Sequence, residues 1–172
     1  KYACAGLFFA RAFFKIGKAF LNSDLAKNAI PQLEKAHKLD SKNFEYQVSL
    51  ADAYLLTGSN EKALDIYQNV LKNNESNKQI HLNLITILYE LGNVQEALNH
   101  IETILEKFDE VSDLLYIKVA FLYELDAREK ALLVLQEALQ YSYDMHPFLF
   151  ELLPEIAFDK EITTIINSFS KN

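Results

Sequence analysis

A repeat of 34 residues constrains the fold of this chain more than any other feature of its sequence. When the sequence is shifted against itself by 34 residues, alanines coincide at four positions: Ala29, Ala63, Ala97 and Ala131. Gly58 falls on Gly92 in the same frame. One further column is apolar throughout: Phe20, Tyr54, Leu88 and Leu122. A period of this length, with apolar residues at helical spacing inside it, predicts an array of helical hairpins.

The composition supports helices joined by short turns. The 172 residues are 50% hydrophobic and 24% charged, which is sufficient for a buried core. Only four glycines and three prolines punctuate the chain, and its single cysteine, Cys4, excludes an internal disulfide. We therefore expect an all-α fold of antiparallel helical hairpins that does not depend on an oxidising compartment.

The frame divides the chain into four repeat units and a C-terminal cap. The units span residues 10–43, 44–77, 78–111 and 112–145, and a degenerate cap covers residues 146–172, all within one domain. Hydrophobic spacing predicts a first helix over residues 2–22, with one inward face formed by Tyr2, Phe9, Phe13, Ile16 and Phe20. Pro31 falls inside the second helix, so we expect a kink there or a late helix start near Asn28.

Polar residues before several helices predict side-chain caps. The candidates are residues 22–24, Ser59 or Asn60, Asn93 with Glu96, Asp126 with Glu129, and Asp159 before the last helix. Asp126 occupies the place that Gly58 and Gly92 hold in the preceding units.

The repeat resembles the tetratricopeptide repeat. The second unit carries that family's pattern most completely, at Leu50, Ala51, Tyr54, Gly58, Ala63 and Tyr67. The third unit matches at Leu84, Gly92, Ala97 and Ile104, and the first at Ile16, Gly17, Phe20, Ala29 and Ala36. The fourth matches mainly at Leu122, Ala131 and Ala138. The family's usual proline near the end of each unit is absent, since Ser41, Glu75, Asp109 and Tyr143 stand there.

The resemblance implies a right-handed α-α superhelix (solenoid) whose first helices line a concave face. It also implies a non-enzymatic scaffold that binds a protein or peptide segment on that face. Two columns of the frame lie beside the apolar positions through which the helices of a hairpin pack. The first column contains Phe14, Val48, Leu82, Tyr116 and Phe150. The second contains Leu21, Leu55, Tyr89 and Tyr123. Between these columns lie Lys18, Asp52, Thr86 and Ala120. The amide side chain of Asn83 is placed to hydrogen-bond the backbone of a bound segment.

Two interpretations of these columns stay open. If they are exposed, Tyr89, Tyr116 and Tyr123 form an aromatic groove for a peptide with apolar anchors. If they pack between neighbouring first helices, only the tips of these side chains reach solvent. Tetratricopeptide modules that bind acidic chaperone tails use Lys and Asn on successive first helices. This chain lacks the basic pair, so we do not expect such a tail as its ligand.

The charge distribution bears on the class of partner. Residues 1–43 carry eight Lys/Arg and three Asp/Glu, a net charge of +5, whereas residues 44–172 carry nine and 21, a net charge of −12. An acidic body repels phosphate backbones, so we expect no nucleic-acid partner. Pentatricopeptide repeats, which bind RNA, usually have 35 residues, whereas the alanines here keep 34.

A second functional hypothesis is self-association into a homodimer. Phe8, Phe9, Phe13 and Phe14 crowd the first helix with more aromatic rings than one face buries. We assign Phe8 and Phe9 to this contact.

The sequence contains no pattern typical of a catalytic, metal or cofactor site. No His-x-x-x-His pattern, His/Cys cluster or glycine-rich phosphate loop is present, so we expect no metal, cofactor or enzymatic activity. No apolar run reaches the length of a membrane span, and we favour a cytoplasmic location. The chain begins with Lys1, so a targeting segment upstream of that residue would not be visible in this sequence.

Overall fold

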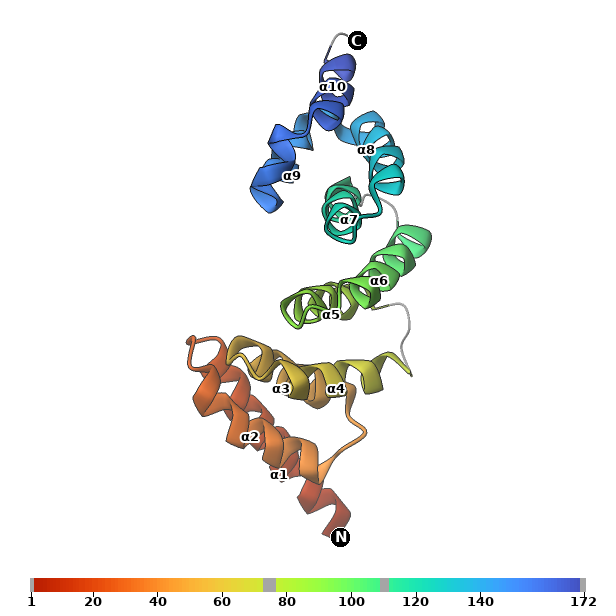
Figure 1. The fold of residues 1–172 in the computed structure, drawn as a ribbon. Helices are drawn as coiled ribbons and strands as arrows, with labels where there is room; N and C mark the ends of the chain where they lie inside the picture. Colours follow the sequence, from red (N-terminus) through yellow and green to blue (C-terminus); the bar gives the residue numbers. More distant parts are fainter. Residues whose placement is uncertain (1, 73–76, 109–111, 171–172) are drawn as a thin grey trace. The chain divides into compact units, whose positions relative to one another are not determined.

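The computed structural model describes residues 2–72, 77–108 and 112–170, and divides into two compact units, Lys1–Ile80 and His81–Asn172. Unit 1 contains α1 (Tyr2–Leu21), α2 (Ala26–Leu39), α3 (Phe44–Leu56) and α4 (Asn60–Leu71). Unit 2 contains nearly all of α5 (Lys78–Glu90), then α6 (Val94–Lys107), α7 (Ser112–Glu124), α8 (Arg128–Ser142) and the elements of the C-terminal segment (Figure 1). Among the described residues there is no strand, which confirms the all-α class.

The helix starts repeat the 34-residue period. The first helices α3, α5 and α7 begin at Phe44, Lys78 and Ser112. The second helices α2, α4, α6 and α8 begin at Ala26, Asn60, Val94 and Arg128. Helix α1 packs on α2, α3 on α4, and α7 on α8, so sequential helices form the hairpins that the repeat predicts. The grouping of all the units into one domain stays a prediction.

The alanine column lies in the hydrophobic core. Ala29, Ala63, Ala97 and Ala131 are all completely or almost completely buried. Gly17 serves the same purpose in the first hairpin, because a Cβ at Gly17 would lie 2.6 Å from Cγ of the buried Leu33. Small residues at these positions let the two helices of a hairpin approach closely.

Each hairpin turns through a residue with a positive φ angle. These residues are Asp24 (φ 57°), Gly58 (φ 72°), Gly92 (φ 76°) and Asp126 (φ 57°), again 34 residues apart. The backbone N–H of the residue that follows each of them closes the turn by donating to the carbonyl of Phe20, Tyr54, Leu88 or Leu122, at 2.8–2.9 Å. The apolar column predicted from the sequence therefore also supplies the acceptors of the four Schellman turns.

Most of the predicted side-chain caps are wrong. The N-caps of α2, α4, α6 and α8 are Leu25, Ser59, Asn93 and Ala127, and none makes a side-chain hydrogen bond to the helix. Their ψ angles lie between 51° and 60°, because the same residue also closes the preceding turn. Asn43 and Asp159 have ψ of 113° and do cap α3 and α10 (Lys160–Phe169), so only the prediction at Asp159 is confirmed in full.

Two expectations for the first hairpin are also corrected. Helix α2 begins at Ala26 and continues through Pro31, so it has no late start near Asn28. Phe9 and Ile16 were expected to face inward, but their side chains are exposed. Helix α1 packs chiefly against α2 and to a smaller extent against α3, and several of its apolar side chains stay exposed in unit 1.

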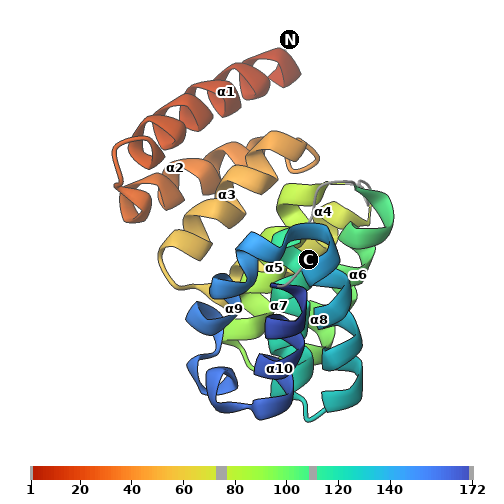
Figure 2. The ribbon, with the colours of Figure 1, turned by 90° about the horizontal axis from the view of Figure 1, so that it is seen from above.

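The C-terminal segment departs from the repeat, as expected for a terminal cap. After α8 come the short 3-10 helix η1 (Tyr143–Met145), α9 (His146–Leu152), η2 (Pro154–Phe158) and α10. Helix α9 packs against α7, and α10 packs against η2 and α8 (Figure 2). None of the helices in the described part of the chain has the length and apolar character of a membrane span.

Candidate functional site

Tyr89 is the most prominent of the predicted partner-binding residues. It lies near the end of α5 and is 42% exposed, yet its ring is held in place. The ring stacks on Phe121 of α7, with centroids 4.8 Å apart and planes at 5°. Its hydroxyl donates to Oε1 of Glu124 at 2.9 Å, and this bond is the main cause of the raised pKa of Tyr89. Tyr89 is therefore an exposed aromatic surface with a fixed orientation.

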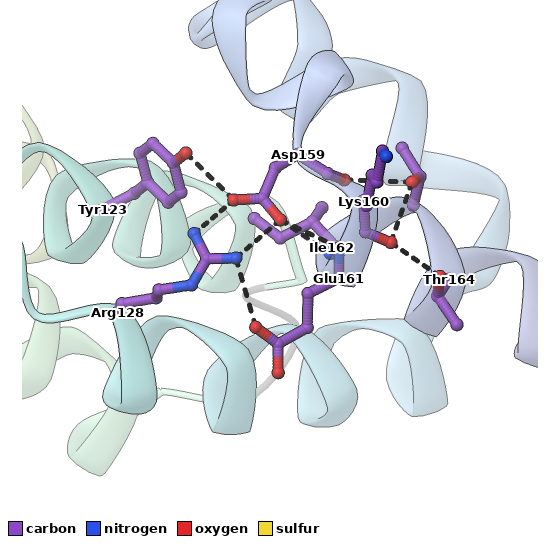
Figure 3. A network of polar contacts seen from close by, with 8 residues as sticks. Tyr123, Arg128, Asp159, Lys160, Glu161, Ile162 and Thr164 are labelled. Atoms are coloured by element: carbon purple, nitrogen blue, oxygen red, sulfur yellow. Dashed lines mark hydrogen bonds and ion pairs between the residues drawn. The ribbon is translucent and has the colours of Figure 1, made fainter.

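The other two tyrosines of the predicted aromatic groove are engaged elsewhere. Tyr116 is completely buried and donates to the backbone carbonyl of Ser142 at 2.7 Å, so it offers no surface to a partner. Tyr123 is half-buried and donates to Oδ2 of Asp159 at 3.1 Å (Figure 3). Of the three rings, only that of Tyr89 is widely exposed.

The remaining candidates of unit 2 lie on α5 with Tyr89. Leu82 and Asn83 are half-buried, and Thr86 is exposed with its hydroxyl donating to the Leu82 carbonyl at 3.3 Å. Thr86 and Tyr89 are three residues apart on one helix and therefore lie on the same side of it. This side of α5 is what remains of the predicted surface in unit 2.

The candidates of unit 1 are buried or half-buried, and none is widely exposed. Phe14 is buried and packs against Tyr46, with ring centroids 4.7 Å apart. Asp52 is half-buried and accepts a hydrogen bond from the Tyr67 hydroxyl. Burial raises the pKa of Asp52, while that bond and the charge of Lys18 act in the opposite direction. Lys18 and Leu55 are half-buried.

The two residues assigned to self-association are exposed. Phe8 is 71% and Phe9 is 53% exposed on α1, and their rings meet edge to face at 5.9 Å. Leu7 and Ile16 on the same helix are also exposed, so α1 presents several apolar side chains to solvent.

A charged network that the sequence did not predict fixes the last helix to the repeat. The Arg128 guanidinium of α8 pairs with both carboxylate oxygens of Asp159, one at 2.7 Å, and donates to Oε2 of Glu161 at 3.1 Å (Figure 3). Asp159 also caps α10 through the backbone N–H groups of Glu161 and Ile162. The guanidinium holds the pKa of Asp159 well below its usual range. The Asp159 cap was visible in the sequence, but its Arg partner was not.

Two histidines that are 19 residues apart in the sequence meet in unit 2. Nδ1 of His81 on α5 lies 2.9 Å from Nδ1 of His100 on α6. Burial, with a smaller contribution from the charge of His81, lowers the pKa of His100 to about 4. A search for closely spaced ligand motifs misses such a pair. No group of three metal-ligating side chains lies together in the part of the chain that the structure describes.

Comparison with known proteins identifies the repeat. A family model described as anaphase-promoting complex, cyclosome, subunit 3 matches residues 22–104, and a tetratricopeptide repeat model matches residues 82–147. No curated protein sequence matches the chain.

Solved structures with the same fold are distant in sequence. MamA from Desulfovibrio magneticus RS-1 (residues 41 to the end) is 16% identical with a TM-score of 0.76, covering 94% of this chain and 92% of that one. YrrB, described as a TPR protein with an unusual peptide-binding site, is 15% identical with a TM-score of 0.72, covering 91% and 82%. At such identities the likeness concerns the fold. Together with the 34-residue period and the two family matches, it shows that the chain is a tetratricopeptide repeat protein.

Proposed function

We propose that the chain binds a peptide or protein segment on the α5 surface of unit 2, with Tyr89 as the anchor. Tetratricopeptide repeat proteins bind peptides or proteins and are generally non-enzymatic scaffolds, and the fold supports such a role in general. The peptide-binding site of YrrB, a structural relative, also favours this proposal.

The observation that carries the proposal is the fixed, exposed ring of Tyr89. Tyrosine is enriched at the energetic centres of interfaces because one side chain offers both apolar area and a hydroxyl. Stacking on Phe121 and the bond to Glu124 restrict the ring before any partner arrives. A partner that packs on it therefore loses little free energy in ordering this side chain.

The charges near Tyr89 indicate the chemistry of the partner. Glu124 bonds the Tyr89 hydroxyl, and the charge of Glu155 on η2 contributes to its raised pKa, so both carboxylates lie near the ring. This surface belongs to the strongly acidic part of the chain, residues 44–172. We infer that the bound segment combines an apolar or aromatic residue with basic neighbours.

A peptide-display experiment tests this function. Peptides selected from a random library on the full chain are measured against wild type, Tyr89→Ala and Tyr141→Ala by isothermal titration calorimetry. Tyr141 is the matched control because it is 74% exposed and lies on α8, the second helix of its hairpin, whereas Tyr89 lies on a first helix. Loss of a central aromatic anchor weakens binding by about tenfold or more, while Tyr141→Ala should leave affinity within about twofold of wild type.

Two outcomes would overturn the proposal. One is that the selected peptides bind Tyr89→Ala as tightly as wild type while circular dichroism shows both folded. The other is that the library yields no peptide that binds the wild-type chain.

A second candidate function, self-association, is favoured by the exposed aromatic side chains of α1. Phe8, Phe9, Leu7 and Ile16 leave this helix with an uncovered apolar face in unit 1. The net charges of +5 on residues 1–43 and −12 on residues 44–172 would attract the start of one copy to the acidic part of another. The occupant of the α1 face would then be a second copy of this chain.

Sedimentation velocity tests this candidate. Wild type should form dimers at about 0.5 mM, and Phe8→Ser/Phe9→Ser should stay monomeric. Phe158→Ser removes an aromatic side chain that is 87% exposed on η2 and should leave dimer formation unchanged. A wild-type monomer at this concentration would rule self-association out.

A further inference from the structure

A pocket of about 330 Å³ lies in unit 1, between α2, α3 and α4. Leu50 and Ile66 give it apolar walls, and Glu34, His37, Tyr54 and Asp65 supply polar groups. Its volume is at the lower end of the range for ligand sites. None of its residues belongs to the Tyr89 surface, so the site holds or fails independently of the proposed function.

His37 lines the pocket and carries a polar atom whose lack of a partner packing alone does not explain. Its Nδ1 is buried, and no hydrogen-bond partner for it lies among the described residues. At the same position of the frame the other three units carry Leu71, Leu105 and Leu139. Leaving a buried polar atom without a hydrogen-bond partner is unfavourable. A turn of the His37 ring towards the pocket would let a ligand in the pocket form a hydrogen bond with this nitrogen.

Tyr54 and Glu34 form the second polar element. The Tyr54 hydroxyl donates to Oε1 of Glu34 at 2.5 Å, and burial, the largest cause, raises the pKa of Tyr54 to about 12. The hydroxyl therefore stays protonated at neutral pH and fixes one oxygen of the carboxylate. Phe20, Leu88 and Leu122 occupy the equivalent places in the other units, so none of them can make this bond.

The face of the Tyr54 ring already attracts a cation. The Lys62 ammonium of α4 lies 5.0 Å from the ring centre. Lys62 is an exposed residue on a flexible stem, so it can leave this position when a stronger cation arrives. Asp65, three residues later on α4, adds a second carboxylate at the pocket.

We propose that this pocket binds the guanidinium group of an arginine side chain carried by a partner protein. The pocket is lined by the carboxylate residues Glu34 and Asp65, by His37 with its unpaired ring nitrogen, and by Tyr54, whose ring face already attracts a cation. A guanidinium has five N–H donors and no acceptor, and it stacks on aromatic rings. Its aliphatic stem suits the walls formed by Leu50 and Ile66. A lysine ammonium is a compact point charge and lacks this planar fork of donors.

NMR titration of the full chain tests the proposal. The probes are the blocked peptides acetyl-GSRSG-amide and acetyl-GSKSG-amide, and the observed signals are the ring resonances of His37 and Tyr54. The arginine peptide should shift both rings saturably with a Kd of about 1–10 mM. The lysine peptide should bind at least about fivefold more weakly.

Three variants separate binding from folding. His37→Leu introduces the residue that the other units carry, so the fold should persist while affinity for the arginine peptide falls about tenfold. Glu34→Gln changes an exposed carboxylate and should weaken binding by a similar factor of about ten. Lys62→Ala removes the competing cation and should tighten binding.

The proposal is overturned if neither ring signal saturates at about 20 mM arginine peptide. Equal affinity of His37→Leu and wild type, or a preference for the lysine peptide, would overturn it as well. Should His37→Leu unfold, Glu34→Gln decides, since its side chain is exposed.

Discussion

At the scale of single residues, the hairpin turns show why some positions tolerate only a few amino acids. Gly58, Gly92, Asp24 and Asp126 all adopt a positive φ angle, which most side chains disfavour. Aspartate is among the residues that tolerate this conformation because its short polar side chain bonds locally. The substitution of Asp for Gly in the fourth unit is therefore explained by backbone conformation.

A substitution at Gly58 tests this account. A Cβ at Gly58 would meet no atom within 4 Å, so the cost of Gly58→Ala is backbone strain alone, about 1–2 kcal/mol. Gly58→Asp should cost less, since Asp126 adopts the same conformation. Urea denaturation of the two variants measures the difference. Equal stability of Gly58→Ala and wild type would contradict the role assigned to this turn.

The His81–His100 pair makes stability depend on pH. The pKa of His100 is about 4 in the folded chain, below the ordinary value of 6.5, so between these values the unfolded chain binds more protons. The stabilising contribution is therefore present above pH 6.5 and is lost as the pH falls towards 4. His100→Asn keeps polar groups but does not titrate, and its free energy of unfolding should fall less steeply between pH 7 and 5 than that of wild type. Parallel curves would refute this origin of the pH dependence.

At the scale of elements, the sequence predicted the helices better than their ends. The 34-residue period and the spacing of apolar residues were sufficient to place the eight helices from α1 to α8, because both follow from how hairpins pack. The predicted caps at Asn93 and Asp126 failed because one residue there both closes a turn and opens a helix. The turn sets the backbone geometry of this residue. The type of amino acid before a helix does not reveal that constraint.

The Arg128 network predicts how the last helix is held. Arg128→Met keeps the length of the side chain but removes both bonds to Asp159 and the one to Glu161. Amide hydrogen exchange should then become faster in α10, with little change in α7. Lys118→Met removes the ion pair of Lys118 with Glu102 and serves as the control, because that pair does not involve α10.

The pH dependence of the same network follows from the lowered pKa of Asp159. Its contribution to stability is complete above the ordinary aspartate pKa of 3.8 and is lost as the pH falls through the lower value of the folded state. In the hydrogen-exchange experiment, unchanged exchange in α10 of Arg128→Met would show that apolar packing alone fixes this helix.

At the scale of the whole molecule, the repeat family could be predicted from the sequence. The residues of the binding surface could only be narrowed to two columns of the frame. Phe14 and Tyr116 belong to one of the two candidate columns and are buried, whereas Tyr89 belongs to the other and is exposed. A column beside the positions through which the helices pack lies at the boundary between core and surface. Small differences in how neighbouring helices pack decide its exposure, and the pattern of one chain does not encode them.

The pocket of unit 1 and the histidine pair were missed for a related reason. His37, Tyr54 and Asp65 are on three helices, and their proximity comes from tertiary packing. The one available signal was His37 at a position where the other units carry leucine.

The most direct test of the central claim, that this repeat protein binds a protein segment on the α5 surface, is hydrogen–deuterium exchange with the tightest peptide from the display selection. The account predicts that the bound peptide slows exchange in α5 around Thr86 and Tyr89, with no comparable protection in α8 around Tyr141. Protection of α8 with α5 unchanged would contradict it and place the binding surface on the second helices.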